Sequence, residues 1–140
     1  FKGYCDALKK SGIIFDKELI IETESFNMND AFKSCEDFLN GKKDFTAIFA
    51  IADAMGIAAM KALSNKGYKL PEDCSIIAID GVEFSNYTIP TLSTLVQPSA
   101  EIGEQAVKIL IDVLKGKNDN RQLKLDTVLR EGETLAKPKA

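Results

Sequence analysis

The stretch IFAIADAMGIAAMKALSNKG, residues 48–67, joins an apolar strand to an alanine-rich helix through one carboxylate, Asp53. The run FTAIFAIA, residues 45–52, is apolar at nearly every position, which is typical of a central parallel strand covered by helices on both faces. The pattern after Asp53 has helical periodicity and ends at Gly67. A buried strand that leads directly into a helix is the repeating unit of a parallel α/β sheet.

The alternation of strand and helix continues on both sides of this unit. Upstream, the pattern predicts a helix ending at Ser11-Gly12, a strand ELIIE at 18–22, and a helix that Asn27 or Asn29 caps and Asn40-Gly41 closes. Downstream, it predicts a strand SIIAID at 75–80, a strand TLSTLVQ at 91–97, a helix capped by Ser99, and a strand LKLDTVL at 123–129. This order predicts a doubly wound parallel α/β sheet, which binds ligands at the carboxyl ends of its strands.

Composition predicts one soluble globular domain. The chain has 140 residues, of which 45% are hydrophobic, enough for a substantial core. It carries 18 basic and 21 acidic residues, a balance without the positive surface that grips nucleic acid. If DNA is involved, another segment must contact it.

Cysteine content and hydropathy predict a cytoplasmic protein. The three cysteines, Cys5, Cys35 and Cys74, have no CxxC spacing and are expected to be reduced core thiols. No apolar run is long enough for a membrane span, and no signal peptide opens the chain. The start at FKGYCDAL lies inside a helical pattern, so we expect the chain to begin within a longer protein.

The residue content favours binding over catalysis. Histidine is absent, which excludes a Ser/His/Asp or Cys/His system and a His-containing metal site within this chain. Neither GxxxxGK[ST] nor GxGxxG is present, so the usual phosphate-cradling loops are missing. The acidic pairs Glu22/Glu24 and Glu72/Asp73 lie in polar surroundings, where solvated carboxylates are expected. We expect no reaction, no metal and no cofactor.

Two blocks with conserved spacing carry a family resemblance. The segment TAIFAIADAMGIAAMKALSNKGYKLPEDCSIIAIDGVEFSNYTIPTLSTLVQPSAEIGEQAVKILIDVL resembles the effector-binding core of the lactose/galactose repressor family of bacterial transcription regulators. Its most specific parts are LPEDCSIIAIDG and IPTLSTLVQPSAEIGEQAV, and the match runs from FKGYCDALKKSGI to LREGETL. The resemblance implies a periplasmic-binding-protein-like type I fold of two lobes, a small effector in the cleft, a homodimer, and operator DNA bound through an upstream helix-turn-helix that this chain lacks.

The resemblance also implies how the chain divides. Residues 1 to about 90 are expected to form most of the carboxyl-terminal lobe. Residues from about 91 to 130 would supply a hinge strand, a helix and a strand that cross to an amino-terminal lobe absent from this chain. Residues 131–140 would form a return segment and tail.

Asp53 has two interpretations, a cap of the following helix or a ligand contact in the cleft, and the cap is favoured because a strand-to-helix junction needs one. At Ala52, sugar-binding relatives often have an asparagine that contacts the ligand. The alanine removes that polar group from the expected pocket.

Asp80, Phe26 and Gln97 are the other candidate ligand-binding residues. Asp80 ends an apolar strand before Gly81 and matches a family aspartate that accepts hydrogen bonds from ligand hydroxyls, although a turn-stabilising role remains open. Phe26 matches an aromatic that lies against the ligand, with a hydrophobic staple as its alternative. Gln97 matches a polar hinge position that reaches the ligand, or serves only the hinge beside Pro98.

A homodimer surface is expected on the helix after Asp53 and the segment after Gly81. Ile57, Lys61, Phe84 and Thr88 match the face through which family members pair, although an apolar helix stripe is also typical of a core. The favoured function is the effector-sensing domain of a bacterial DNA-binding transcriptional regulator. The expected effector is a small molecule, a sugar or a sugar-derived compound. The alternative is a sugar-binding component of a transport system.

Overall fold

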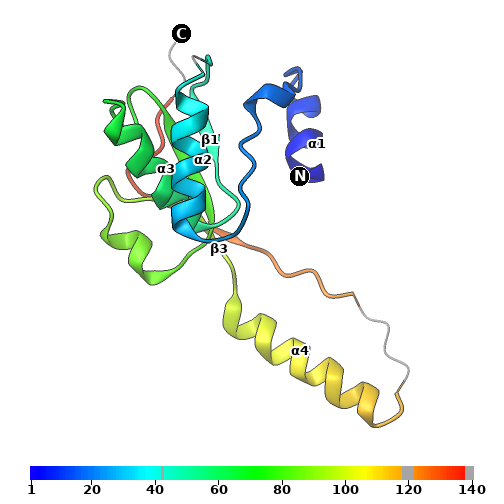
Figure 1. The fold of residues 1–140 in the computed structure, drawn as a ribbon. Coiled ribbons are helices and arrows are strands. Elements are labelled where there is room, and N and C mark those ends of the chain that lie inside the picture. Colours follow the sequence, from blue (N-terminus) through cyan, green and yellow to red (C-terminus); the bar gives the residue numbers. More distant parts are fainter. Residues whose placement is uncertain (42, 118–121, 138–140) are drawn as a thin grey trace.

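The computed structural model describes residues 1–41, 43–117 and 122–137. Its elements are, in chain order, α1 (Lys2–Lys10), the 3-10 helix η1 (Lys17–Leu19), α2 (Met28–Leu39), β1 (Ala47–Phe49), α3 (Asp53–Asn65), β2 (Ser75–Asp80), the 3-10 helix η2 (Glu83–Tyr87), β3 (Ser93–Val96), α4 (Ser99–Leu114) and β4 (Val128–Arg130). The helices α2 and α3 lie side by side against the sheet (Figure 1).

The sheet has the strand order β1-β2-β3-β4. The first three strands run parallel, with Ile48 opposite Ile76 and Ile77 opposite Ser93, whereas β4 runs antiparallel to β3. The α/β class and the parallel sheet predicted from the sequence are confirmed.

The core lies between this sheet and the two packed helices. Small residues let α3 approach the sheet closely: a Cβ on Gly56 would lie 3.1 Å from the Cβ of Ala78 and 3.2 Å from a methyl group of Leu92. The buried members of the main cluster are Ala31, Ala50, Met55, Ala58, Met60, Leu63, Cys74, Ile76, Ala78 and Leu92. The alanine-rich pattern of residues 54–62 is therefore a packing surface.

The strand FTAIFAIA is shorter and less covered than its sequence predicts. Only Ala47–Phe49 form β1, which lies at one end of the strand order, and Phe49 is 43% exposed. The expectation of a central strand covered on both faces is wrong for the described residues, because α2 and α3 pack on the face that carries Ile48 and no described strand lies beyond β1.

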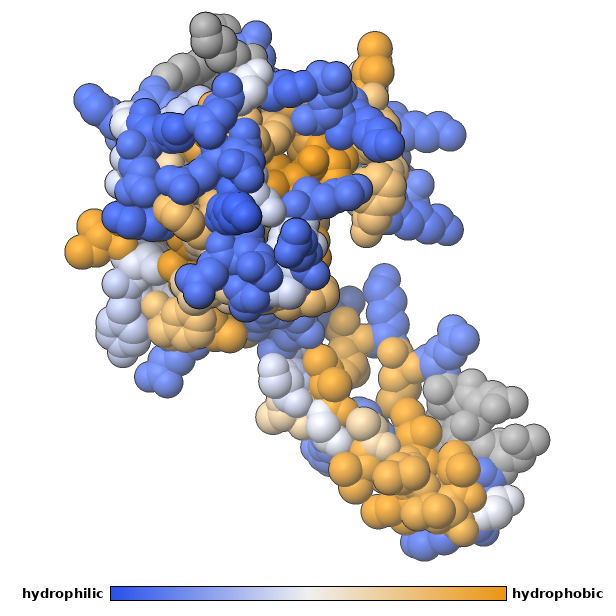
Figure 2. All heavy atoms as spheres, viewed as in Figure 1, coloured by the Kyte–Doolittle hydropathy of each residue, from blue (hydrophilic) through white to orange (hydrophobic). Residues whose placement is uncertain are grey.

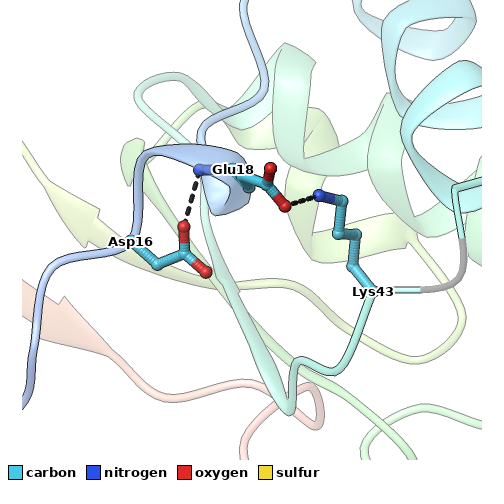
Figure 3. A network of polar contacts seen from close by, with 3 residues as sticks. All are labelled: Asp16, Glu18 and Lys43. Carbon is cyan, nitrogen blue, oxygen red and sulfur yellow. Dashed lines mark hydrogen bonds and ion pairs between the residues drawn. The ribbon is translucent and has the colours of Figure 1, made fainter.

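The predicted strand at 18–22 is also wrong, because the chain forms η1 there. The Asp16 carboxylate accepts a hydrogen bond from the Glu18 N–H at 2.8 Å and so favours a turn. Glu18 in turn forms an ion pair with Lys43, which fastens this segment to the chain ahead of β1 (Figure 3). Further along, Asn27 caps α2 by accepting from the Asp30 N–H at 2.9 Å, one of the two caps predicted.

The segment after β4 returns to the sheet and joins two strands. The Thr134 hydroxyl accepts from the Ser93 N–H at 2.9 Å and donates to the Ile76 carbonyl at 2.7 Å. The chain approaches so closely that a Cβ on Gly132 would lie 2.3 Å from the Thr91 carbonyl oxygen. The segment LREGETL is thus held against β2 and β3 by hydrogen bonds.

Two expected boundaries in the carboxyl-terminal part differ from the structure. Helix α4 begins at Ser99, with Pro98 as its N-cap residue, and the Ser99 hydroxyl donates to the Gln97 carbonyl at 3.4 Å instead of capping the helix. Of the predicted strand at 123–129, only its end pairs in β4, which extends to Arg130. Residues 123–127 lie outside the sheet because no described strand runs beside them.

Helices α1 and α4 contribute no buried residue to the core. In Figure 1, α4 extends away from the sheet, and α1 is joined to α2 by an extended segment. Figure 2 shows apolar side chains gathered over α4, which include Val107, Leu110, Val113 and Leu114. Among the helices of the described residues, none has the length and apolar character needed to cross a membrane.

Candidate ligand-binding site

Three predicted site residues follow three neighbouring strands. Ala52 comes after β1, Asp80 is the last residue of β2, and Gln97 comes directly after β3. Because these strands are parallel and adjacent, their carboxyl ends meet at one edge of the sheet, where α/β proteins bind ligands. The structure therefore brings these three positions to the same edge.

Asp80 and Gln97 are in direct contact. The Gln97 side-chain amide donates to Oδ1 of Asp80 at 2.8 Å, and the Gln97 N–H donates to the Asp80 carbonyl at 3.2 Å. Both side chains are partly exposed. Among the described residues, Oδ2 of Asp80 has no hydrogen-bond donor, so this oxygen can accept from a ligand.

The backbone at Asp80 is strained. Its φ of 132° is unusual for a residue other than glycine, and Gly81 follows with a φ of 76°. A Cβ on Gly81 would lie 2.7 Å from both Val96 methyl groups, so the turn passes directly over β3. Strain of this kind is often found where a side chain is held in a functional orientation.

Asp53 is not a helix cap, and the favoured interpretation is wrong. It is the first residue of α3 rather than the residue before it, and its side chain accepts no capping bond. Instead, Oδ2 accepts from the Val82 N–H and the Ser85 hydroxyl, both at 2.9 Å, and Oδ1 accepts from the Thr94 hydroxyl. The residue is 0% exposed, so this carboxylate joins α3, β3 and the turn after β2.

The partners of Asp53 were not predicted from the sequence. Ser85 and Thr94 are fully buried, and Arg130 on β4 donates from Nη2 to the Ser85 hydroxyl and to the Val82 carbonyl at 3.4 Å. The available signal was weak: Thr94 is one of several polar residues in the strand TLSTLVQ, and Arg130 is the only arginine among the described residues. Neither feature indicates which residue it contacts.

Phe26 has an exposed ring. It is 75% exposed and belongs to neither buried cluster. The segment that carries it leads into α2 at the end of the sheet from which α4 departs (Figure 1). Its neighbours form a polar turn, in which the Ser25 hydroxyl donates to the Asp30 carboxylate at 2.5 Å. An exposed aromatic ring at this end of the sheet is available to contact a ligand.

The expected pairing residues differ in exposure. Ile57 is half-buried and packs against the main core cluster, and Lys61 is exposed. Phe84 is 51% exposed on η2 and is accompanied by exposed Tyr87. The Thr88 hydroxyl is used locally, because it donates to the Ser85 carbonyl at 3.2 Å and accepts from the Leu92 N–H at 2.9 Å.

Other titratable groups form no reactive cluster in the part of the chain that the structure describes. No group of three or more Cys, Asp or Glu side chains there could hold a metal ion. Burial raises the pKa of Cys35 and of Cys74 to about 11, with Asp73 contributing to the shift at Cys74. Both thiols are therefore protonated at neutral pH and poor nucleophiles.

Comparison with known proteins places the chain in a family. A model described as "Periplasmic binding protein-like domain" matches residues 1–135. The HTH-type transcriptional regulator MalR of Clostridium butyricum is 36% identical over 132 residues, which cover 94% of this chain and 39% of MalR. The chain thus spans about two fifths of that relative.

Solved structures of regulators have the same fold. A complex of the transcriptional regulator CelR with cellobiose is 27% identical with a TM-score of 0.86, covering 94% of this chain and 40% of CelR. A sugar-binding transcriptional regulator of the LacI family from Escherichia coli, complexed with phosphate, is 31% identical with a TM-score of 0.85. The match covers 97% of this chain and 49% of that regulator's chain. The predicted resemblance to lactose/galactose repressors and the periplasmic-binding-protein-like fold are confirmed.

Proposed function

We propose that this chain, which belongs to the family of periplasmic-binding-protein-like domains, is the effector-sensing part of a bacterial DNA-binding transcriptional regulator. The observation that carries the proposal is the Asp80–Gln97 pair at the carboxyl edge of a parallel sheet, with Oδ2 of Asp80 open to a ligand donor. Relatives that are named as regulators and that bind a sugar support it.

The effector is a sugar or a sugar-derived molecule. A carboxylate oxygen accepts strongly from a ligand hydroxyl, and the Gln97 side chain adds a second polar contact beside it. Phe26 supplies an exposed ring against which the apolar face of a sugar can lie. Ala52 contributes a small apolar surface and leaves room for a ligand group.

Asp53 acts behind this surface. Its carboxylate is buried and holds the Val82 N–H, and Val82 lies two residues after Asp80. We assign Asp53 to orienting the ligand-facing turn rather than to touching the ligand.

The intact protein is a cytoplasmic homodimer that binds operator DNA through a helix-turn-helix outside this chain. Ile57, Lys61, Phe84 and Thr88 form the pairing surface, with Phe84 as its most exposed apolar member. Residues 1 to about 90 form most of one lobe, to whose sheet β3 and β4 also belong. Within residues 91–130, the segment that carries α4 crosses to a second lobe, and the chain from residue 131 returns to the first. Effector binding changes the closure of the lobes and so the geometry of the DNA-binding parts. The domain performs no reaction and needs no cofactor.

The experiment compares this function with that of a transport component. The full natural protein is incubated with a pool of random DNA duplexes, and retained DNA is challenged with cellobiose, maltose, glucose and ribose while calorimetry measures binding of each sugar. Selective retention of one DNA motif, released by a sugar that also binds, is the expected result. Sugar binding without retention of any DNA would instead support the transport component and overturn the proposal.

A further inference from the structure

The buried polar network around Asp53 reaches β4 through one residue, Arg130. Its Nη2 donates to the Ser85 hydroxyl and, at 3.4 Å, to the Val82 carbonyl. Ser85 is fully buried and is the only buried residue of η2. Arg130 is thus the link between β4 and the turn that follows β2.

The hydrogen bonds connect the Arg130 guanidinium to the Asp53 carboxylate through the Ser85 hydroxyl, which lies between the two charged groups. A serine hydroxyl has one proton to donate, and it accepts from Arg130. The Ser85 hydroxyl lies 2.9 Å from Oδ2 of Asp53 and 2.7 Å from the Val82 carbonyl, and that carbonyl already accepts from Arg130. The Ser85 proton is therefore best placed on Asp53, which gives the order Arg130, Ser85, Asp53.

Electrostatics favours keeping this link intact. Asp53 is 0% exposed, and none of the ion pairs formed within residues 1–41, 43–117 and 122–137 includes it. A buried carboxylate is costly unless it is hydrogen-bonded and compensated by positive charge. The guanidinium supplies that charge from the far side of Ser85, while its own Nε is buried without a hydrogen-bond partner. The donors to Asp53 are all neutral, so moving Arg130 away would leave its carboxylate without this positive charge behind Ser85.

The turn that Arg130 holds lies between two functional positions. The strained Asp80 and the glycine Gly81 precede Val82, and η2 carries the exposed rings of Phe84 and Tyr87. Within these few residues, the chain passes from the ligand-facing carboxylate to the exposed aromatic surface. A shift of Val82 and Ser85 must therefore displace both neighbours.

We infer that Arg130 is a positioning residue that, through Ser85 and Val82, ties strand β4 to the turn between Asp80 and Phe84. Because β4 pairs antiparallel with β3 and follows the excursion through α4, a displacement of the α4 segment is passed through Arg130 to the Asp80 turn and to the aromatic surface. The roles of Asp80 and of the aromatic surface rest on the proposed function, whereas the link itself does not.

Hydrogen–deuterium exchange of the full natural protein tests the link without any ligand. Arg130→Gln is expected to speed amide exchange in residues 82–88 about tenfold to hundredfold while the amides of α3 and β2 stay protected, because a charge-assisted hydrogen bond is lost locally. Arg130→Lys should restore part of the protection, because an ammonium can still donate to Ser85. Glu131→Gln, which removes the neighbouring exposed charge, is the matched control and should change nothing.

Unchanged exchange at residues 82–88 in Arg130→Gln would overturn the inference. If exchange instead rises throughout the domain, Ser85→Ala decides: a local rise at 82–88 supports the link, and no rise there overturns it. Self-association, measured by sedimentation on the same variants, tests whether Arg130 also affects the aromatic surface formed by Phe84 and Tyr87. Arg130→Gln should weaken it about threefold or more relative to Glu131→Gln, and equal association would remove the connection to the aromatic surface. A failed DNA or sugar assay would leave the exchange result standing, so the two proposals fail separately.

Discussion

The side chain of Gln97 holds Oδ1 of Asp80 at 2.8 Å, so the carboxylate is fixed before any ligand arrives. The backbone N–H of Gln97 adds a bond of 3.2 Å to the Asp80 carbonyl and continues the pairing of β2 with β3 past the end of the ladder. Because the carboxylate is already oriented, a ligand loses less free energy in ordering it. The hinge role and the binding role proposed for Gln97 are therefore compatible.

Asp80→Asn tests the ligand assignment. Asparagine keeps the shape and tolerates a positive φ, but it loses the charge and replaces one acceptor oxygen with a donor. Ligand binding should weaken by about 1.5 to 3 kcal/mol, or roughly tenfold to hundredfold. Calorimetry with a sugar that binds the unaltered protein measures the change, with exposed Asp44→Asn as the control. Unchanged affinity together with unchanged thermal unfolding would make Asp80 a turn residue.

Phe84→Asp tests the pairing surface. Its ring is 51% exposed, so the substitution leaves the core intact, whereas Ile57→Asp would also disturb the cluster on which Ile57 packs. A two-fold contact would bury one new carboxylate from each copy, and removing both from water is costly. We therefore expect monomers at micromolar concentration. Sedimentation measures the oligomeric state, and Phe26→Asp, which replaces an even more exposed ring elsewhere, is the control. A dimer that survives Phe84→Asp would show that pairing uses another face.

Gly81→Ala tests the strained turn. The added Cβ would lie 2.7 Å from the Val96 methyl groups and 2.8 Å from its Cα, and the φ of 76° disfavours any side chain. We expect a loss of about 2 kcal/mol or more in the free energy of unfolding. Gly103→Ala, at a helical position with nothing within 4 Å, should instead gain about 0.5 to 1 kcal/mol. Urea unfolding of the two variants gives the comparison, and equal stabilities would contradict the strain argument.

The local signals in the sequence predicted most elements, because those elements depend on neighbouring residues. The strand 75–80 and the helix that starts after Asn27 follow from apolar periodicity and from a cap three residues before Asp30. The wrong strand at 18–22 has the composition of a strand, but its pairing depends on a partner that local sequence does not specify.

The position of the candidate site could be predicted from the sequence, but the hydrogen bonds among its residues could not. Asp80 and Gln97 lie at strand ends, which the alternation of elements reveals. The role of Asp53 could not be read locally, because its partners lie 29 to 41 residues away in sequence. A capping aspartate and a buried network aspartate have the same local pattern, and only tertiary contacts separate them.

The buried thiols give a pH-dependent prediction. Burial raises the pKa of the Cys35 and Cys74 thiols from the ordinary value of 9.0 to about 11. Well below pH 9 both thiols are largely protonated in the folded and unfolded states, so they add almost no pH dependence there. Between about pH 9 and pH 11 the unfolded state releases these protons first, so stability falls as pH rises.

Alkylation and unfolding measure this effect. At pH 8, iodoacetamide should leave Cys35 and Cys74 unmodified in the native protein and modify both after unfolding in urea. Cys35→Ser with Cys74→Ala should flatten the loss of stability between pH 9 and pH 11, relative to its own stability at pH 8. Native alkylation of Cys74 as fast as in urea would show that the thiol is accessible.

The apolar side chains of α4 belong to neither buried core cluster. None of its residues is buried, and Ile102, Val107, Leu110, Ile111, Val113 and Leu114 are all exposed on a helix that extends away from the sheet. A contiguous apolar surface of this kind is unstable in water and favours association. The 140-residue chain produced alone should therefore self-associate at micromolar concentration. Leu110→Lys with Val113→Lys should shift it toward the monomer, while Ser64→Lys with Ser11→Lys adds the same charge at exposed polar positions and should not. Light scattering across a dilution series measures the mass, and a monodisperse monomer of the unaltered chain would show that α4 packs against its own lobe in solution.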